Sequence, residues 1–295
     1  MGCQIKRTLA ITLLSLSIIL AMSSYPISRA SHPKTTNPPL AFSNNGCLVL
    51  SYHRVLPKNW LINIWSHWIE FYTDSSELTK FSVSGSDFRY QIDYLQRQGV
   101  RFITPTELEA FIKGKAKMPP KCALITFDDV DISVYRDAFP VLQRKNIPFA
   151  LFVITGNVGN QNFHGLKFCT WPEIKEMADS NLATVGVHTN NLHYLDSKTQ
   201  KPPFLAPGSA RCFAVDMRLS KQAMRKKIGI TPCYFAYPYG FGTPETDKVA
   251  LGSGMHLIFT LSSGVVKPGD PAFFVKRTLV NKNTWPAIAA WAARK

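Results

Sequence analysis

Acidic residues are scarce in this sequence. Its 295 residues include 19 Asp and Glu against 34 Lys and Arg, which gives a formal net charge of +15. Such a basic balance indicates an anionic environment, which could be nucleic acid, lipid headgroups or an acidic wall polymer. No nucleic-acid-binding module is visible, so an anionic membrane or cell-wall surface is favoured. General solubility is the equally simple alternative.

The sequence also has no long apolar run near its start that would span a membrane comfortably. The apolar stretch Leu9–Met22 is short for a span and follows Lys6 and Arg7. A small-x-small site, Ser28-Arg29-Ala30, comes after it. This order is typical of a secretory signal peptide. We therefore expect cleavage after about Ala30 and a secreted protein retained at the cell surface, with an uncleaved anchor as the alternative.

Cysteines are few, and none has the spacing of a zinc knuckle. The six cysteines include no C-x-x-C pair, which argues against a cysteine-based metal site. Cleavage after Ala30 would remove Cys3 and leave an odd number, so not all could pair within the chain. A disulfide between Cys169 and Cys212 is conceivable, and nothing in the sequence supports it.

The chain divides into three parts by composition. Residues 1–30 form the expected signal peptide, and residues 31–46 form a linker rich in Pro, Ser, Thr and Asn. Residues 47–295 form one domain. Within it, short apolar segments alternate with helical ones such as 86–98 and 211–228. That alternation predicts a parallel α/β architecture.

Two adjacent carboxylates end one of the apolar segments. Cys122–Phe127 reads as a buried strand and stops at Asp128 and Asp129. Parallel α/β folds place their active sites at the carboxyl ends of strands, so both side chains could reach one pocket. One carboxylate would then suit a metal ion and the other a general base. The simpler alternative is a solvated Asp-Asp turn after a core strand.

Two histidines follow a second apolar segment. Val185–Val187 leads to His188, and His193 lies five positions further on. Two neutral imidazoles and one carboxylate make a three-ligand set that leaves metal positions open for water and substrate. Together with the strand that ends in Asp128 and Asp129, this pattern predicts a metal site.

These motifs resemble those of the polysaccharide deacetylases (NodB-homology superfamily, carbohydrate esterase family four). Thr126–Asp129 is similar to the T-F-D-D motif of that family. The general family's histidine motif reads H-[ST]-x-x-H, whereas His188–His193 reads H-T-N-N-L-H. This wider spacing, together with Ser51–Val55, resembles the poly-N-acetylglucosamine deacetylases of the IcaB and PgaB type. From about Leu48 to the end of the chain, further segments add to the resemblance: Phe127–Asp131, Ile154–Gly159, Asn162–His164 and Ala236–Gly240. It implies a distorted (β/α) barrel of about seven strands.

The resemblance also implies which residues form the site. Asp129, His188 and His193 would hold a divalent metal ion, with zinc expected and cobalt, nickel or iron as alternatives, because this ligand set accepts all of them. Asp128 would be the general base that takes a proton from water.

Two further roles in proton transfer and charge stabilisation are implied. The backbone N–H of Tyr239 would stabilise the oxyanion. His53 would protonate the departing amine, although it could instead be a histidine at the edge of the core that bonds a carbonyl. Weaker candidates for the acid are His67, His164 and His256.

The sequence departs from the general family in the residue that orients the general base. The general family has an arginine shortly before its Pro-Tyr motif that orients the base, and none precedes Pro238-Tyr239 here. Asp131 and Arg277 could take that role, and no motif chooses between them. The residues that bind the substrate are not identified.

The resemblance implies hydrolysis of an amide bond in a polysaccharide. We expect metal-dependent N-deacetylation of poly-β-1,6-N-acetyl-D-glucosamine, which releases acetate and gives a partly cationic biofilm exopolysaccharide. A deacetylase of peptidoglycan or chitin-like polymers is the alternative within enzymes. A catalytically silent glycan-binding surface protein is the alternative outside them. We expect a monomer.

One aromatic segment stands apart from these motifs. Asn59–Tyr72 contains three tryptophans, with Leu61, Ile64, Trp65 and Trp68 at helical spacing. A helix or lid packed on the core is the simpler interpretation. The alternative is an interfacial segment that dips into a membrane surface.

Overall fold

The computed structural model describes residues 40–43, 46–56, 80–163 and 166–294. The strands are β1 (Gly46–Tyr52), β2 (Arg54–Leu56), β3 (Ser82–Ser84), β4 (Arg101–Phe102), β5 (Lys121–Asp129), β6 (Phe149–Val153), β7 (Ala183–Val187), β8 (Tyr234–Ala236), β9 (Leu257–Phe259), β10 (Val265–Val266) and β11 (Thr278–Leu279). The helices are α4 (Gly85–Arg97), α5 (Pro105–Ile112), α6 (Phe139–Arg144), α7 (Trp171–Asp179), α8 (Ala210–Ile228), α9 (Pro244–Gly252) and α10 (Trp285–Ala293). Shorter helical turns are η1 (Val134–Ala138), η2 (Thr155–Asn157), η3 (Pro203–Leu205) and η4 (Pro238–Gly240).

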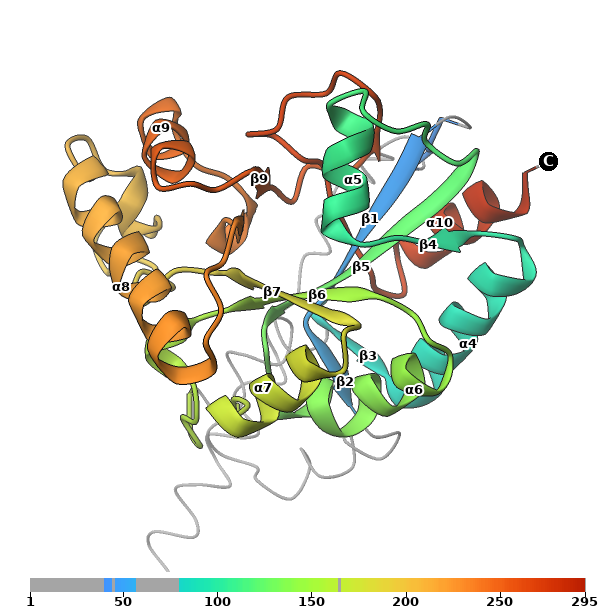
Figure 1. Cartoon of the computed structure of the whole chain (residues 1–295), viewed down its shortest axis with the longest axis horizontal. Coiled ribbons are helices and arrows are strands. Elements are labelled where there is room, and N and C mark those ends of the chain that lie inside the picture. Colours follow the sequence, from blue (N-terminus) through green and yellow to red (C-terminus); the bar gives the residue numbers. More distant parts are fainter. Residues whose placement is uncertain (1–39, 44–45, 57–79, 164–165, 295) are drawn as a thin grey trace, which may run out of the picture. The chain divides into compact units, whose positions relative to one another are not determined.

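Among the described residues, nine strands form one sheet around which the helices are arranged, and β2 and β3 pair with each other in a separate small sheet. The main path of the larger sheet runs β10-β1-β5-β6-β7-β8-β9, and all of its neighbouring pairs are parallel except β10 with β1. Every residue of β1 is buried, as expected for a strand in a parallel sheet covered on both faces. Figure 1 shows α4, α6, α7 and α8 following one another around the sheet. The predicted distorted (β/α) barrel of about seven strands is confirmed.

The segment from Val275 to Leu279 joins the two ends of this sheet. Val275 forms a parallel bridge with Phe259 of β9. Thr278 and Leu279 form β11, which pairs in parallel with β1. Arg277 therefore lies at the seam where the sheet closes on itself. Phe273 and Phe274, just before this segment, are exposed and lie in a turn that begins at Pro271.

Helix boundaries follow the capping residues. In α5, the Thr104 side chain accepts from the Glu107 N–H and the Glu107 carboxylate accepts from the Thr104 N–H, which is a capping box. Thr170 and Glu173 form the same motif at α7. The segment 133–146 is not one continuous α-helix: a π-helical turn, η1, comes first and α6 follows it. Pro140 explains the break, because it offers no N–H to an α-helical ladder.

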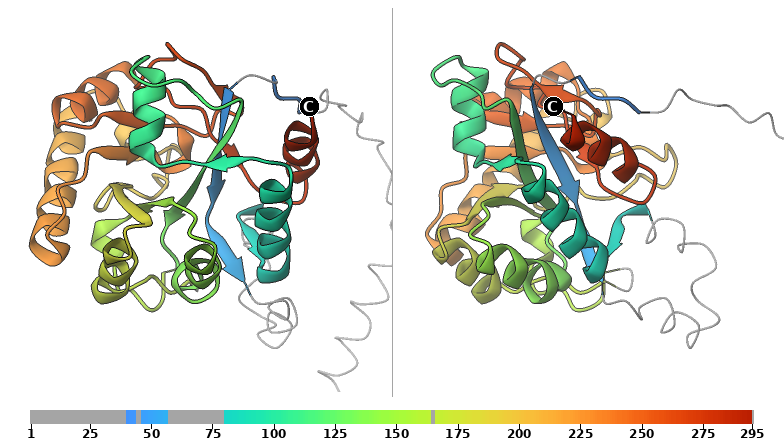
Figure 2. Two further views of the ribbon diagram at one scale, coloured as in Figure 1. Left: turned by 45° about the vertical axis from the view of Figure 1, so that its right-hand side comes forward. Right: turned by 90° about the vertical axis from the view of Figure 1, so that its right-hand side faces the viewer.

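The C-terminal helix α10 was not anticipated from the sequence. It packs beside α4, as the views in Figure 2 show, and the Trp285 ring contacts the Tyr94 ring edge-on with 5.8 Å between centroids. In the part of the chain that the structure describes, no helix is long and apolar enough to cross a membrane. The predicted signal peptide and the segment Asn59–Tyr72 lie outside the described residues. Cys169 and Cys212 are both free thiols.

Candidate active site

Asp128 and Asp129 are the last two residues of β5, and both are buried. Asp129 and Val130 have φ values of 64° and 65°. This left-handed turn is unusual for residues with a Cβ and indicates a functional constraint. Because the strand turns sharply at this point, two carboxylates that would point to opposite faces of a regular strand both face the same cavity.

His188 follows β7 and is anchored from two sides. Its N–H donates to the Val153 carbonyl at 2.9 Å, and its Nδ1 lies 2.8 Å from the Ala236 carbonyl. A carbonyl only accepts, so Nδ1 carries the proton and Nε2 is left with a lone pair. Burial lowers the pKa of His188 to about 4, which keeps the ring neutral at neutral pH.

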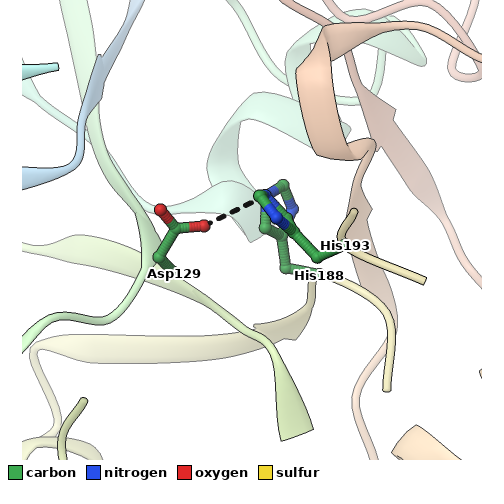
Figure 3. A group of neighbouring side chains, drawn as sticks. All are labelled: Asp129, His188 and His193. Atoms are coloured by element: carbon green, nitrogen blue, oxygen red, sulfur yellow. Dashed lines mark ion pairs between the residues drawn. The ribbon is translucent and has the colours of Figure 1, made fainter. Parts of the chain in front are cut away.

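His193 completes a group that fits a divalent metal ion. One ligand atom each from Asp129, His188 and His193 lies within 4.8 Å of the others. The Asp129 Oδ1 atom is 3.7 Å from His188 Nε2 and 3.3 Å from His193 Nε2, and Figure 3 shows the three side chains converging. This buried Oδ1 receives no hydrogen bond. A converging oxygen without a donor beside two imidazole nitrogens is what a metal ion would satisfy.

The charge state of Asp129 suits the same interpretation. Burial would raise its pKa, but His193, His53 and His188, together with Arg54, hold the pKa well below its ordinary value. Arg54 Nη2 lies 3.6 Å from Asp129 Oδ2, the oxygen that faces away from the histidine pair. The sequence analysis assigned no role to Arg54. Its place next to His53 in the Ser51–Val55 motif was the feature that could have indicated one.

Asp128 is held by a buried arginine. Arg277 is fully buried, and it donates from Nη1 to Asp128 Oδ1 at 2.6 Å and from Nη2 to Oδ2 at 2.8 Å. Its Nε donates to the Thr260 carbonyl at 2.9 Å, and its guanidinium lies 5.3 Å from the centre of the Phe152 ring. Burial would raise the pKa of Asp128, but Arg277 holds that pKa below its ordinary value.

Arg277 therefore orients Asp128, and the other candidate does not. Asp131 Oδ1 accepts the N–H of Ser133 instead and so stabilises the turn after β5. The sequence alone gave Arg277 no motif to support it. The only feature of the sequence that pointed to Arg277 was its position just before the final short strand.

His53 lies between β1 and β2 and faces the same carboxylates. Its Nε2 is 3.9 Å from Asp128 Oδ2, and its ring packs on Phe81 with 4.7 Å between centroids. Burial lowers the pKa of His53 to about 4, although Asp128 and Asp129 partly oppose this. The resting ring is therefore neutral at neutral pH, and it must receive a proton before it can donate one.

Tyr239 lines the same cavity. It is in η4 with φ 61°, and its ring packs against the His193 ring with 5.0 Å between centroids. The next residue, Gly240, has φ 90°, and a Cβ there would lie 2.3 Å from the Leu261 Cβ. Only glycine fits this position, so the turn that presents the Tyr239 backbone is tightly fixed.

These residues line a cavity of about 610 Å³. Its remaining walls are largely apolar and include Phe81, Phe163, Leu166 and Leu261. A pocket of this size with a few convergent polar groups is typical of a small-molecule or polymer-unit site.

Of the weaker candidates for the acid, only His256 is described, and it is not in the cavity. It precedes β9 at the amino end of the strand, is half exposed, and its Nδ1 is 3.2 Å from Glu109 Oε2. The site lies at the carboxyl ends of the strands, so His256 is at the wrong end. His67 and His164 fall outside the described residues.

Comparisons with known proteins agree with this geometry. The family profile described as polysaccharide deacetylase matches residues 115–258. A poly-beta-1,6-N-acetyl-D-glucosamine N-deacetylase of Staphylococcus aureus strain N315 is 32% identical over 95% of this chain and 94% of that protein. A protein of the same name from Staphylococcus epidermidis is 30% identical over 93% of each. The structure of IcaB from Ammonifex degensii is 44% identical, with a TM-score of 0.77 over 86% of this chain and all of that one.

Proposed function

The chain belongs to the polysaccharide deacetylase family and is a hydrolase of amide bonds, and on this premise we propose that it removes acetyl groups from poly-β-1,6-N-acetyl-D-glucosamine. One observation supports this chemistry most directly. Asp128, held by two hydrogen bonds from Arg277, lies beside the converging ligand atoms of Asp129, His188 and His193. The substrate rests on the relatives, whose names specify this polymer and which match nearly the whole chain.

The residues of the chain divide the work of hydrolysis among them. A divalent metal ion held by Asp129, His188 and His193 would lower the pKa of a water molecule and polarise the acetamide carbonyl. Asp128 takes the proton of that water as the oxygen adds to the carbonyl carbon. The Tyr239 N–H donates a hydrogen bond to the resulting oxyanion.

His53 completes the reaction at the nitrogen. The amine can leave only after protonation, and the neutral His53 must first gain a proton to supply it. Asp128 Oδ2, 3.9 Å away, is the nearest source of that proton. The carbon–nitrogen bond then breaks, acetate departs, and the sugar retains an amine that becomes an ammonium group at neutral pH.

Two alternatives are less well supported. A silent glycan-binding protein has no need of a buried carboxylate beside a three-ligand set, because burying Asp128 costs free energy that its partner Arg277 must offset. A deacetylase of peptidoglycan or chitin-like polymers would use the same chemistry. The relatives' names favour the β-1,6-linked polymer.

We also propose that the protein is exported and retained at an anionic membrane or wall surface as a monomer. The apolar N-terminal stretch supports the export, and the net charge of +15 supports the retention. N-terminal sequencing of protein recovered from the cell surface tests it. We expect the recovered protein to begin near residue 31. A protein that still begins at Met1 would contradict the predicted cleavage.

Acetate release from purified poly-β-1,6-N-acetyl-D-glucosamine tests the proposed activity. The full-length chain would be assayed with added zinc, cobalt, nickel or iron, beside Asp128→Asn and His188→Ala variants. We expect metal-dependent release that both variants lose. Release only from peptidoglycan or chitin oligomers would show that one of these is the substrate instead. Absence of release from all three polymers with metal bound would contradict the proposed enzymatic activity. The metal that supports activity at the lowest concentration identifies the preferred ion.

A further inference from the structure

The segment that carries the two candidate metal-binding histidines has no regular structure of its own. His188 and His193 are five positions apart, and residues 188–192 are not in a helix or strand. Thr189 has φ 73°, so the chain turns sharply directly after His188. A loop of this kind holds a side chain in place only if other parts of the fold fix its backbone.

The two histidines differ in how well they are fixed. His188 is 1% exposed and is anchored through both its N–H and its Nδ1. His193 has 17% of its side chain exposed and packs against the Tyr239 ring. The position of His193 therefore depends on the loop that leads to it.

Asp216 anchors that loop from outside. It lies on the inner face of α8 and is 6% exposed. Its Oδ1 accepts the N–H of Asn190 at 2.7 Å, and its Oδ2 accepts the N–H of Asn191 at 2.7 Å. Each carboxylate oxygen thus holds one of two successive peptide groups, which fixes both the position and the direction of the backbone.

The loop is also held by η2. Thr155 Oγ1 donates to Asn190 Oδ1 at 3.0 Å, and the Gly156 N–H donates to the Asn190 carbonyl at 3.0 Å. A Cβ on Gly156 would lie 2.0 Å from Asn191 Oδ1, so η2 and the loop are in direct contact. Asp216 closes a clamp around residues 190 and 191, which come shortly before His193.

The cost of burying Asp216 indicates that the clamp serves more than local packing. Burial raises its pKa, and only the two backbone hydrogen bonds oppose that change. Within the described part of the chain, no cation pairs with it. A buried carboxylate without a counter-ion is rare.

We propose that Asp216 is a positioning residue that sets His193 for metal binding through the backbone of Asn190 and Asn191. This inference rests on the metal site of the proposed function. Asp216 touches neither the reacting atoms nor the three ligands. It acts in the way that residues around a metal's ligands act elsewhere, where their loss weakens metal affinity by about 10–100-fold.

Asp216→Asn is the sharpest test, because it keeps the shape and changes one oxygen into an NH₂ group. That group would face a backbone N–H, so one hydrogen bond is replaced by two opposed donors. Zinc affinity would be measured by titration against a competing chelator. We expect the dissociation constant to rise by about tenfold or more, while the metal-free far-ultraviolet spectrum stays unchanged. At saturating zinc, kcat should return to within about threefold of the unmodified chain, because the ligands themselves are intact.

Asp137→Asn is the matched control. Asp137 is a part-buried carboxyl in a helical segment, its pKa is likewise raised by burial, and it lies in η1, an element that donates no hydrogen bond to Asn190 or Asn191 in the described part of the chain. Its zinc affinity should equal that of the unmodified chain. Should Asp216→Asn not fold, Asp216→Glu replaces it. The longer side chain keeps both oxygens but not their position, so an intermediate loss of affinity is expected.

The outcomes separate this inference from the proposed metal site. If the unmodified chain binds zinc, His188→Ala loses it, and folded Asp216→Asn or Asp216→Glu binds zinc as tightly as the unmodified chain, then Asp216 is not a positioning residue. A loss of affinity equal in Asp137→Asn and Asp216→Asn would also overturn the role. If the unmodified chain and His188→Ala bind zinc equally, the metal site itself is wrong.

Discussion

Replacing Arg277 with methionine should reveal how strongly the fold depends on the charge balance at its site. The guanidinium and the Asp128 carboxylate are 0% and 1% exposed and share hydrogen bonds of 2.6 and 2.8 Å. Arg277→Met leaves the carboxylate buried without its partner. Breaking a buried pair in this way costs about 3–5 kcal/mol, so the free energy of unfolding of the metal-free protein in urea should fall by that amount.

A second substitution shows whether the charge is the cause. Asp128→Asn removes the charge and keeps the shape, so the double variant Arg277→Met/Asp128→Asn should recover most of the lost stability. The two changes should therefore be strongly non-additive. A loss below about 1 kcal/mol in Arg277→Met, or an additive double variant, would refute the reasoning.

The pH dependence gives an independent check of the same pair. In the unmodified chain the pKa of Asp128 lies below its ordinary value, so the pair stabilises the fold above that value and its contribution is lost as the pH falls through the lowered pKa. Without Arg277, burial alone raises the pKa of Asp128. As the pH falls, protonation neutralises Asp128 in the Arg277→Met variant and so removes part of its destabilisation. The stability difference should be larger at about pH 8 than at about pH 5, and an equal difference would contradict this account.

Other predictions concern the reaction itself and are read from acetate release. His53→Gln should lower kcat by about 10²-fold or more with zinc affinity unchanged, because it removes a proton donor and no ligand, and an unaltered kcat would exclude His53 as the acid. Gly240→Ala should lower kcat by about 10²-fold, because its new methyl group meets Leu261 and displaces the Tyr239 N–H. Gly252→Ala, where a Cβ meets nothing within 4 Å, is the control for this change.

The sequence predicted the parts of the site that end long buried strands. Asp128, Asp129 and His188 each follow an apolar run in a parallel sheet, and the structure brings all three into one cavity. The carboxyl ends of parallel strands lie at one edge of the sheet, so the strand pattern indicated a shared location for these residues, and the family resemblance supplied their roles. The predicted roles of these residues stay predictions until metal binding and catalysis are measured.

The parts that the sequence could not predict depend on short elements and on contacts between distant residues. β11 has two residues and no apolar pattern, so the sequence could offer Arg277 only as one of two candidates to orient Asp128, which lies 149 positions earlier. Asp216 was similarly hidden, because a single acid on the buried face of α8 has no pattern of its own. The charge and hydrogen-bond balance that identifies both residues exists only in three dimensions.

The seam of the sheet links completion of the site to completion of the fold. Chain growth delivers Asp128 long before Arg277, and the segment that carries Arg277 also joins β9 to β1. A nascent or truncated chain that ends before the seam has a base without its counter-ion and a sheet with two open edges. The same short segment therefore completes both the charge pair of the candidate base and the closure of the sheet.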